Sequence, residues 1–114
     1  MSSRFYLQIH RGDPTTTKRP PLGERETIKS LLDSALPRLL WADDSEAQNS
    51  SLSLTLSPAK GPVQWITIEP KKGSLKKLGE LCREKSWRVF DPDAESLEEV
   101  DLADVDGWYL RNHG

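Results

Sequence analysis

Several features that would point directly to a function are missing from this sequence of 114 residues. Cys82 is the only cysteine, so no intramolecular disulfide can form, and with only two histidines the chain cannot complete a structural zinc site. No stretch approaches the roughly 20 apolar residues of a membrane-spanning helix, and the first residues do not have the pattern of a secretory signal. We therefore predict a cytoplasmic protein that has no membrane segment and binds no metal or other cofactor.

The sequence also lacks a group of residues that would act together in catalysis. A thiol nucleophile needs a base within about 3 Å and a lowered pKa. Cys82 belongs to the apolar stripe of a predicted helix, however, and His10 alternates onto the opposite face of a predicted sheet. We predict that the protein is not an enzyme and has no catalytic residue, with a carboxylate pair working as acid and base as the alternative left open.

The composition is that of a folded, well-solvated domain. The apolar fraction of 35% is low and the charged fraction of 30% is high. Four tryptophans compensate in part, because each aromatic side chain can bury roughly 150–250 Å². A chain of this length suits one domain, which we assign to residues 1–114.

Charge is distributed unevenly along the chain. Residues 58–88 hold eight lysines and arginines against three acids, whereas residues 89–114 hold Arg111 against eight acids. Such asymmetry has two interpretations. The acidic end is either solvated or packed on the basic stretch, or it is a recognition surface.

Hydrophobic periodicity predicts six main elements. Alternating apolar residues indicate strands, and apolar residues spaced three and four apart indicate helices. The predicted order is strand 5–9, helix 24–36, strand 51–57, strand 63–69, a helix capped by Ser74, and strand 86–91. This β-α-β-β-α-β order predicts an α+β, ferredoxin-like fold, a four-stranded antiparallel sheet with two helices on one face, followed by an acidic C-terminal extension over residues 91–114.

The same periodicity predicts which side chains are buried. Within strand 63–69 we expect Ile66 and Ile68 to face the core, and Val63 and Trp65 to lie on the opposite face. His10 is expected to point outward from the first strand. The predicted core consists of Phe5, Leu7, Ile9, Ile28, Leu31, Leu32, Ala35, Leu52, Leu54, Ile66, Ile68, Leu78, Leu81, Cys82 and Val89.

Two short motifs invite functional readings that their chemistry does not support. The Arg-Gly-Asp sequence at residues 11–13 is better explained as a turn before Pro14 than as an adhesion site, because adhesion needs an extracellular protein. Asp91, Asp93 and Glu95 have the spacing that begins a calcium-binding loop. A serine and a leucine stand where that loop requires glycine and a bidentate glutamate, which argues against calcium.

The uncovered face of the predicted sheet raises the possibility of nucleic-acid binding. Domains of this topology stack bases on aromatic side chains of the two central strands, and Tyr6 and Trp65 stand at such places. The acidic chain opposes a polyanionic partner, and the aromatic motif of those domains is missing. We favour the alternative that Trp108, Tyr109 and Leu110 cover the two aromatic residues.

Three segments carry a resemblance to known proteins. "LQIHRGDP" (7–14), "PPLGERETIKSLLDSALPRLLW" (20–41) and "LCREKSWRVFDPD" (81–93) resemble stretches of small uncharacterised bacterial proteins, which look like immunity or partner proteins of polymorphic toxin systems. The resemblance implies a bacterial cytoplasmic protein that neutralises a toxin by binding it. Ser86 departs from the pattern, which has glycine before the tryptophan.

Together these observations predict a non-enzymatic protein-binding module that neutralises a toxin or another basic partner through an acidic surface. Binding of RNA or single-stranded nucleic acid around Tyr6 and Trp65 is the alternative function. Carboxylates supply charge for steering, and aromatic residues dominate the binding energy of many interfaces. The predicted partner-binding residues are Asp91, Asp93, Glu95, Glu98, Glu99, Asp101, Trp108 and Tyr109.

Overall fold

A computed structural model describes residues 6–11, 20–71, 75–93 and 98–112 of the chain. The elements are, in chain order, β1 (Leu7–Arg11), α1 (Arg25–Ala35), β2 (Leu40–Trp41), β3 (Glu46–Gln48), β4 (Leu52–Ser57), β5 (Trp65–Pro70), α2 (Lys76–Lys85), β6 (Trp87–Phe90), the short 3₁₀ helix η1 (Leu102–Asp104) and α3 (Val105–Asn112). The predicted Ser74 cap, the residues of the Gly12–Pro14 turn and Phe5 lie outside the described residues.

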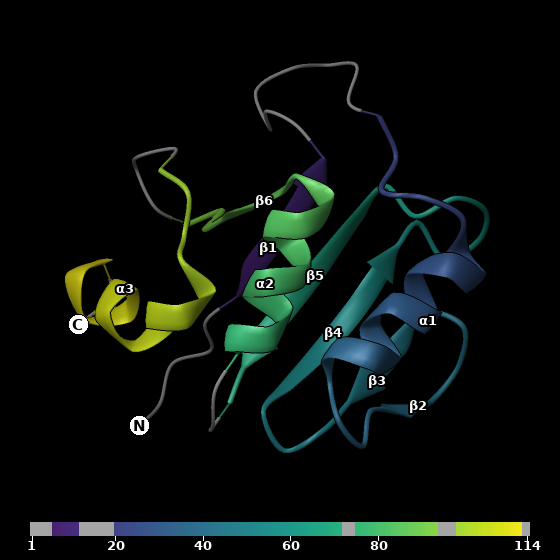
Figure 1. Cartoon of the computed structure of the whole chain (residues 1–114), viewed down its shortest axis with the longest axis horizontal. Helices are drawn as coiled ribbons and strands as arrows, with labels where there is room; N and C mark the ends of the chain where they lie inside the picture. The colour runs from purple at the N-terminus through teal and green to yellow at the C-terminus, as the bar shows by residue number, and fades with distance from the viewer. Residues whose placement is uncertain (1–5, 12–19, 72–74, 94–97, 113–114) are drawn as a thin grey trace.

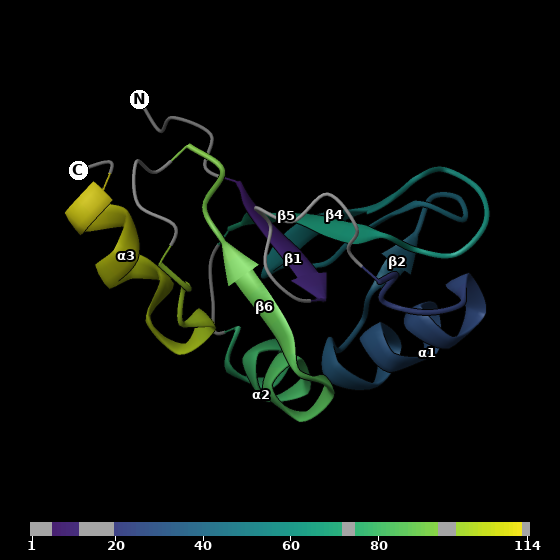
Figure 2. The ribbon, with the colours of Figure 1, turned by 90° about the horizontal axis from the view of Figure 1, so that it is seen from above.

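The strands form one antiparallel sheet in the order β2-β3-β4-β5-β1-β6. Helices α1 and α2 lie on one side of it, and α3 lies beyond β6 at the end of the molecule opposite α1 (Figures 1 and 2). The protein is therefore α+β, as predicted from the sequence. The strands predicted from alternation are neighbours in the sheet as β4, β5, β1 and β6, but the sheet has six strands among the described residues rather than four.

The two additional strands, β2 and β3, extend the sheet beyond β4 from a segment that the sequence predicts to be a connection. Their turn is organised by Asp43, whose Oδ1 accepts the N–H groups of Ser45 at 2.7 Å and Glu46 at 2.8 Å. These donors stabilise the charged carboxylate and lower its pKa. Helix α1 adds support, because Lys29 pairs with Asp44 at 3.1 Å and lies 5.0 Å from the ring of Trp41.

The core lies between the sheet and helices α1 and α2, and most of the predicted core is confirmed. Leu31 and Ala35 are only half-buried, although they pack against the core. The prediction for Val63 is wrong, because it is fully buried. Val63 precedes β5 and pairs with Gly23 in an isolated bridge, so the alternation of the strand does not extend to it.

His10 is on the predicted face of the sheet, but its side chain is buried there. Its backbone does place it on the face opposite Ile9, but its side chain is only 4% exposed. The imidazole stacks on Trp65, with 6.3 Å between the ring centroids, and its Nε2 lies 3.1 Å from Oε1 of Gln8. An aromatic neighbour thus buries a residue that alternation alone predicts to be solvated.

The C-terminal segment is part of the folded body. Val100, Leu102 and Trp108 are buried members of the core, and η1 contacts α2. The contact is close because Gly79 has no side chain. A Cβ at that position would lie 3.2 Å from Cβ of Leu102. The segment that the sequence presents as a weakly patterned extension therefore forms η1 and α3.

Candidate functional site

Two of the predicted partner-binding residues are buried and contact each other. Asp91 is 3% exposed and Trp108 is 4% exposed, and the indole Nε1 of Trp108 donates to Oδ2 of Asp91 at 2.9 Å. The other oxygen of Asp91 accepts the backbone N–H of Asp93 at 2.9 Å. Neither Asp91 nor Trp108 is available on the surface, so the expectation that both would meet a partner there is not met.

The other predicted residues are placed differently. Glu99 and Arg88 form an ion pair across the edge of β6, and Asp101 caps η1 by accepting the N–H of Ala103 at 2.9 Å. Asp93 and Glu98 are exposed, and Tyr109 is half-buried. Glu95 lies outside the described residues. With Asp104 and Asp106, the exposed carboxylates form what we call the acidic surface, which consists of Asp93, Glu98, Glu99, Asp101, Asp104 and Asp106.

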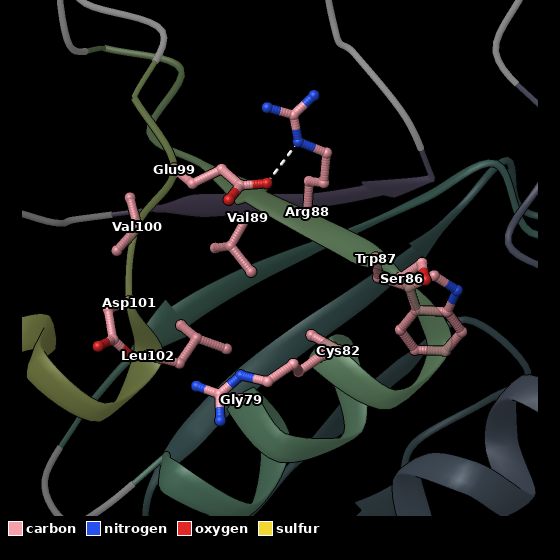
Figure 3. Close-up of a pocket in the computed structure, with 11 residues that line it drawn as sticks. Gly79, Cys82, Ser86, Trp87, Arg88, Val89, Glu99, Val100, Asp101 and Leu102 are labelled. Atoms are coloured by element: carbon pink, nitrogen blue, oxygen red, sulfur yellow. Dashed lines mark hydrogen bonds and ion pairs between the residues drawn. The ribbon is translucent and has the colours of Figure 1, made fainter.

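A pocket of about 480 Å³ lies between this segment, β6 and α2 (Figure 3). Its volume falls within the range of about 300–1,000 Å³ that is common for ligand pockets. Val89, Val100, Leu102 and Cys82 line it together with Arg83, and the ion pair of Arg88 with Glu99 lies along one rim.

The outer edge of β6 opens into the same pocket. The N–H of Val100 donates to the carbonyl of Val89 at 2.8 Å, on the side of β6 that faces away from β1. Backbone groups of an antiparallel strand alternate in direction, so those of Trp87 point to this outer side as well. The chain leaves the edge at Asp101, and no backbone hydrogen bond of the described residues reaches the outward groups of Trp87.

The sheet face opposite α1 and α2 is the site of the alternative nucleic-acid reading. Register places Trp65, His10 and Arg88 in one row across three strands. Arg88 is paired with Glu99 and lies 5.1 Å from the ring of Phe90. Leu110 is 70% exposed, so it does not form the predicted cover over the aromatic residues.

Cys82 lines the pocket, but its thiol is a poor nucleophile. Burial raises its pKa to about 12, so it is protonated near neutral pH. Among the described residues, no group of three histidines, cysteines or acids is placed to hold a metal ion. Within the same residues, no helix is sufficiently long and apolar to cross a membrane.

Sequence reasoning identified the acidic residues but missed the pocket beside them. The pocket forms because residues 98–100 pair with β6. Hydrophobic periodicity describes each segment by itself, so it cannot predict which segments pair. One signal was present: exposed Glu99 and Asp101 alternate with buried Val100 and Leu102. That alternation over four residues is the pattern of a strand-like segment with one face buried.

Comparisons with protein-family models, with curated proteins and with solved structures find no match for this chain.

Proposed function

We propose that the protein is a non-enzymatic binding module that takes up a basic protein partner through the acidic surface. The observation that supports this proposal is that the acidic surface belongs to a segment packed on the folded core. Asp93 lies two residues after buried Asp91, and the other five exposed carboxylates lie between residues 98 and 106, on a segment fixed to the core by Val100, Leu102 and Trp108. A charged surface on a fixed base loses little conformational freedom when a partner binds.

Exposed basic residues lie beside the acidic surface: Arg83 shares a pocket with Glu99 and Asp101, and Lys71 shares one with Asp104 and Asp106. Within the described residues, Arg88 pairs with Glu99, and Arg111 lies 3.7 Å from Asp104. Both pairs are largely solvent-exposed, so each contributes little free energy. A basic partner can therefore replace them at small cost. Complementary charge speeds association, and the effect weakens as salt shortens the Debye length to about 8 Å or less.

Toxin neutralisation in a bacterial cytoplasm is the specific role that we propose, and it rests on the resemblance to immunity and partner proteins. We also propose that β4, β5, β1 and β6 with α1 and α2 are a ferredoxin-like core, to which the β2–β3 hairpin and the C-terminal segment are added. The antiparallel order of those four strands supports this interpretation.

Nucleic-acid binding on the opposite face is the second candidate, favoured by the row of Trp65, His10 and Arg88. The charge of this row is weak, because its one arginine is already paired with Glu99. Affinity for nucleic acid depends mainly on neutralising phosphates with lysine and arginine. The acidic surface therefore has the stronger support.

The test is affinity capture from an extract of the producing cells with three versions of the protein. The wild-type chain is compared with the double variant Asp93→Asn/Asp106→Asn. These two residues are chosen because, in the wild-type, neither carboxylate forms an ion pair with a described residue. The proposal expects capture of a basic protein that the double variant retains at least about tenfold less well, with wild-type capture falling as salt rises.

The matched control is Glu24→Gln/Glu26→Gln, which removes the same charge from exposed residues at the start of α1. It should capture the partner as the wild-type does. Equal loss in both double variants would show that only net charge matters, and capture of nucleic acid by all three would favour the second candidate.

A further inference from the structure

The pocket beside β6 is lined by charged groups of both signs, which leave it without a net charge. These groups are Arg83, Arg88, Glu99 and Asp101. Arg88 and Glu99 form an ion pair with each other along the rim. Among the described residues, no ion pair reaches either Arg83 or Asp101. Within that part of the chain, the pocket therefore combines a cation and an anion that are not yet paired.

The unpaired cation and anion come from two different walls of the pocket. Arg83 is on α2, one turn after Gly79, which is the residue that packs closely on Leu102. Asp101 directly precedes Leu102 in the C-terminal segment, and one of its carboxylate oxygens caps η1. Both side chains are exposed, so each charge is hydrated. A ligand that lies between the two walls can contact both charges.

The remaining lining of the pocket is largely apolar. Val89, Leu102 and Cys82 are buried residues of the core that also line the pocket (Figure 3). The edge of β6 is open at Trp87, whose backbone N–H and carbonyl point to the outer side of the strand. The volume of about 480 Å³ accommodates a small organic molecule. Such a molecule would meet an apolar surface, two backbone polar groups and two opposite charges.

This combination selects the charge of the ligand. A cation would be attracted by Asp101 but repelled by Arg83, and for an anion the two effects are reversed. An uncharged apolar molecule would displace water from both side chains without replacing its hydrogen bonds. A molecule with one ammonium and one carboxylate group can pair with both, while its apolar body displaces water from Val89 and Leu102.

We propose that the pocket beside β6 binds a small apolar zwitterion, with the chemistry of a free amino acid that has an apolar side chain. The carboxylate of the ligand accepts hydrogen bonds from Arg83, its ammonium group donates to Asp101, and its side chain lies on Val89 and Leu102. This inference goes beyond the proposed function and does not depend on it, because the ligand is a small molecule and not a basic protein.

The experiment is an NMR titration of the full chain with L-phenylalanine. The proposal expects saturable chemical-shift changes at the amides of Val89, Val100 and Leu102, with a Kd on the order of 1 mM or tighter for a ligand of this size. Two analogues each lack one of the charges: phenethylamine has no carboxylate, and hydrocinnamate has no ammonium group. Each should bind about fivefold more weakly or worse, because it loses one charge-assisted contact and keeps one repulsion.

Two protein variants identify which end of the ligand meets which wall. Arg83→Gln should weaken phenylalanine binding about threefold to tenfold and should not weaken phenethylamine, which has no carboxylate to lose. Asp101→Asn keeps an oxygen that can cap η1. It should weaken phenylalanine to a similar extent and should not weaken hydrocinnamate. Lys85→Gln and Glu84→Gln are the controls, at exposed residues of α2 that do not line the pocket, and should change none of the three affinities.

Several results would overturn the zwitterion site. They are the absence of saturable shifts at about 10 mM phenylalanine, shifts confined to residues outside the pocket, equal binding of the one-charge analogues, and affinities that neither variant changes. None of these results bears on the proposed function. That function is tested by protein capture with changes at Asp93 and Asp106, which do not line this pocket.

Discussion

At the scale of single residues, Ser86 holds an unfavourable backbone conformation. It caps the C-terminus of α2 with φ 61° and ψ 32°, in the left-handed region. That region costs a residue with a Cβ about 1–2 kcal/mol, and glycine is the usual residue at such a cap.

We therefore expect Ser86→Gly to raise the free energy of unfolding by about 0.5–1 kcal/mol, after the greater entropy of unfolded glycine is subtracted. Ser86 is exposed, so few contacts are lost. Urea denaturation measures the change. Ser86→Ala is the control and should change stability little, because alanine bears the same strain. A destabilised glycine variant would contradict this account of the cap.

The Trp108–Asp91 hydrogen bond should contribute more than a similar bond at the surface. Trp108→Phe removes the indole donor and leaves a buried carboxylate with one partner fewer, which we expect to cost about 1.5–3 kcal/mol. The matched change is Trp41→Phe. It removes the 2.9 Å bond from Trp41 to exposed Asp33, for which we expect less than about 1 kcal/mol. Thermal and urea unfolding of both variants would decide, and equal losses would argue against a special role of the buried bond.

The thiol of Cys82 should make the fold sensitive to alkaline pH. Its pKa is raised from 9.0 to about 12 in the folded state, so the unfolded chain releases this proton first. Its contribution to stability is complete below pH 9 and is lost between pH 9 and 12, at up to about 1.4 kcal/mol per pH unit. Cys82→Ala should reduce the slope of stability against pH over that range, whatever its effect on packing. Parallel slopes would show that the thiol is not buried as described.

At the scale of elements, Arg25 joins α1 to two loops that support the additional strands. Its Nη1 donates to the carbonyl of Asp44 at 2.8 Å, and its Nη2 donates to the carbonyl of Pro58. We expect Arg25→Lys to cost about 1–2 kcal/mol, because lysine cannot reproduce this two-armed geometry. Hydrogen exchange should quicken in Glu46–Gln48 more than in Leu7–Arg11. Arg83→Lys, at an exposed arginine of α2, is the control and should change neither.

The elements that could be predicted are those whose own residues show the hydrophobic periodicity of a strand or a helix. Leu52, Leu54 and Leu56 alternate cleanly, and Ile28 and Leu32 lie one turn apart, so β4 and α1 followed from the sequence. Strands β2 and β3 have two and three residues, which is too few to show alternation. They form because Asp43 organises their turn and α1 holds them, which are contacts outside the strands themselves.

For the candidate site, too, features written in the local sequence could be predicted, and features that depend on contacts between distant residues could not. Charge counting located the acidic residues, because their number and sign are written in the sequence. It could not separate buried Asp91 from exposed Asp93, since the difference depends on Trp108, which is 17 residues away from Asp91. The sequence prediction favoured Trp108 as an exposed anchor because aromatic residues are common in interfaces. They are equally common in cores, and here the core contains it.

At the scale of the whole molecule, the acidic segment combines a part in the folded core with the proposed binding surface. Its apolar residues Val100, Leu102 and Trp108 join the core, while its carboxylates stay at the surface. The same segment also pairs with the outer edge of β6 near Phe90 and shortens the edge that is open to other chains. The same segment therefore supplies core residues and the proposed binding surface. Deleting it would remove both at once.

This integration predicts that a chain ending at Asp93 will not keep its stability. Each of the three lost apolar side chains contributes roughly 1.5–3 kcal/mol by burial, and Asp91 also loses its indole donor. The total exceeds about 5 kcal/mol, against the roughly 5–15 kcal/mol of a whole domain. We expect the truncated chain to melt without cooperativity or far below the full chain, and to associate through the opened β6 edge, as circular dichroism and sedimentation would show. Leu110→Ser, at a residue that is 70% exposed on α3, should melt as the wild-type does. A truncated chain that unfolds cooperatively within a few degrees of the full chain would show that the segment is an appendage, and binding could then be tested with the segment removed.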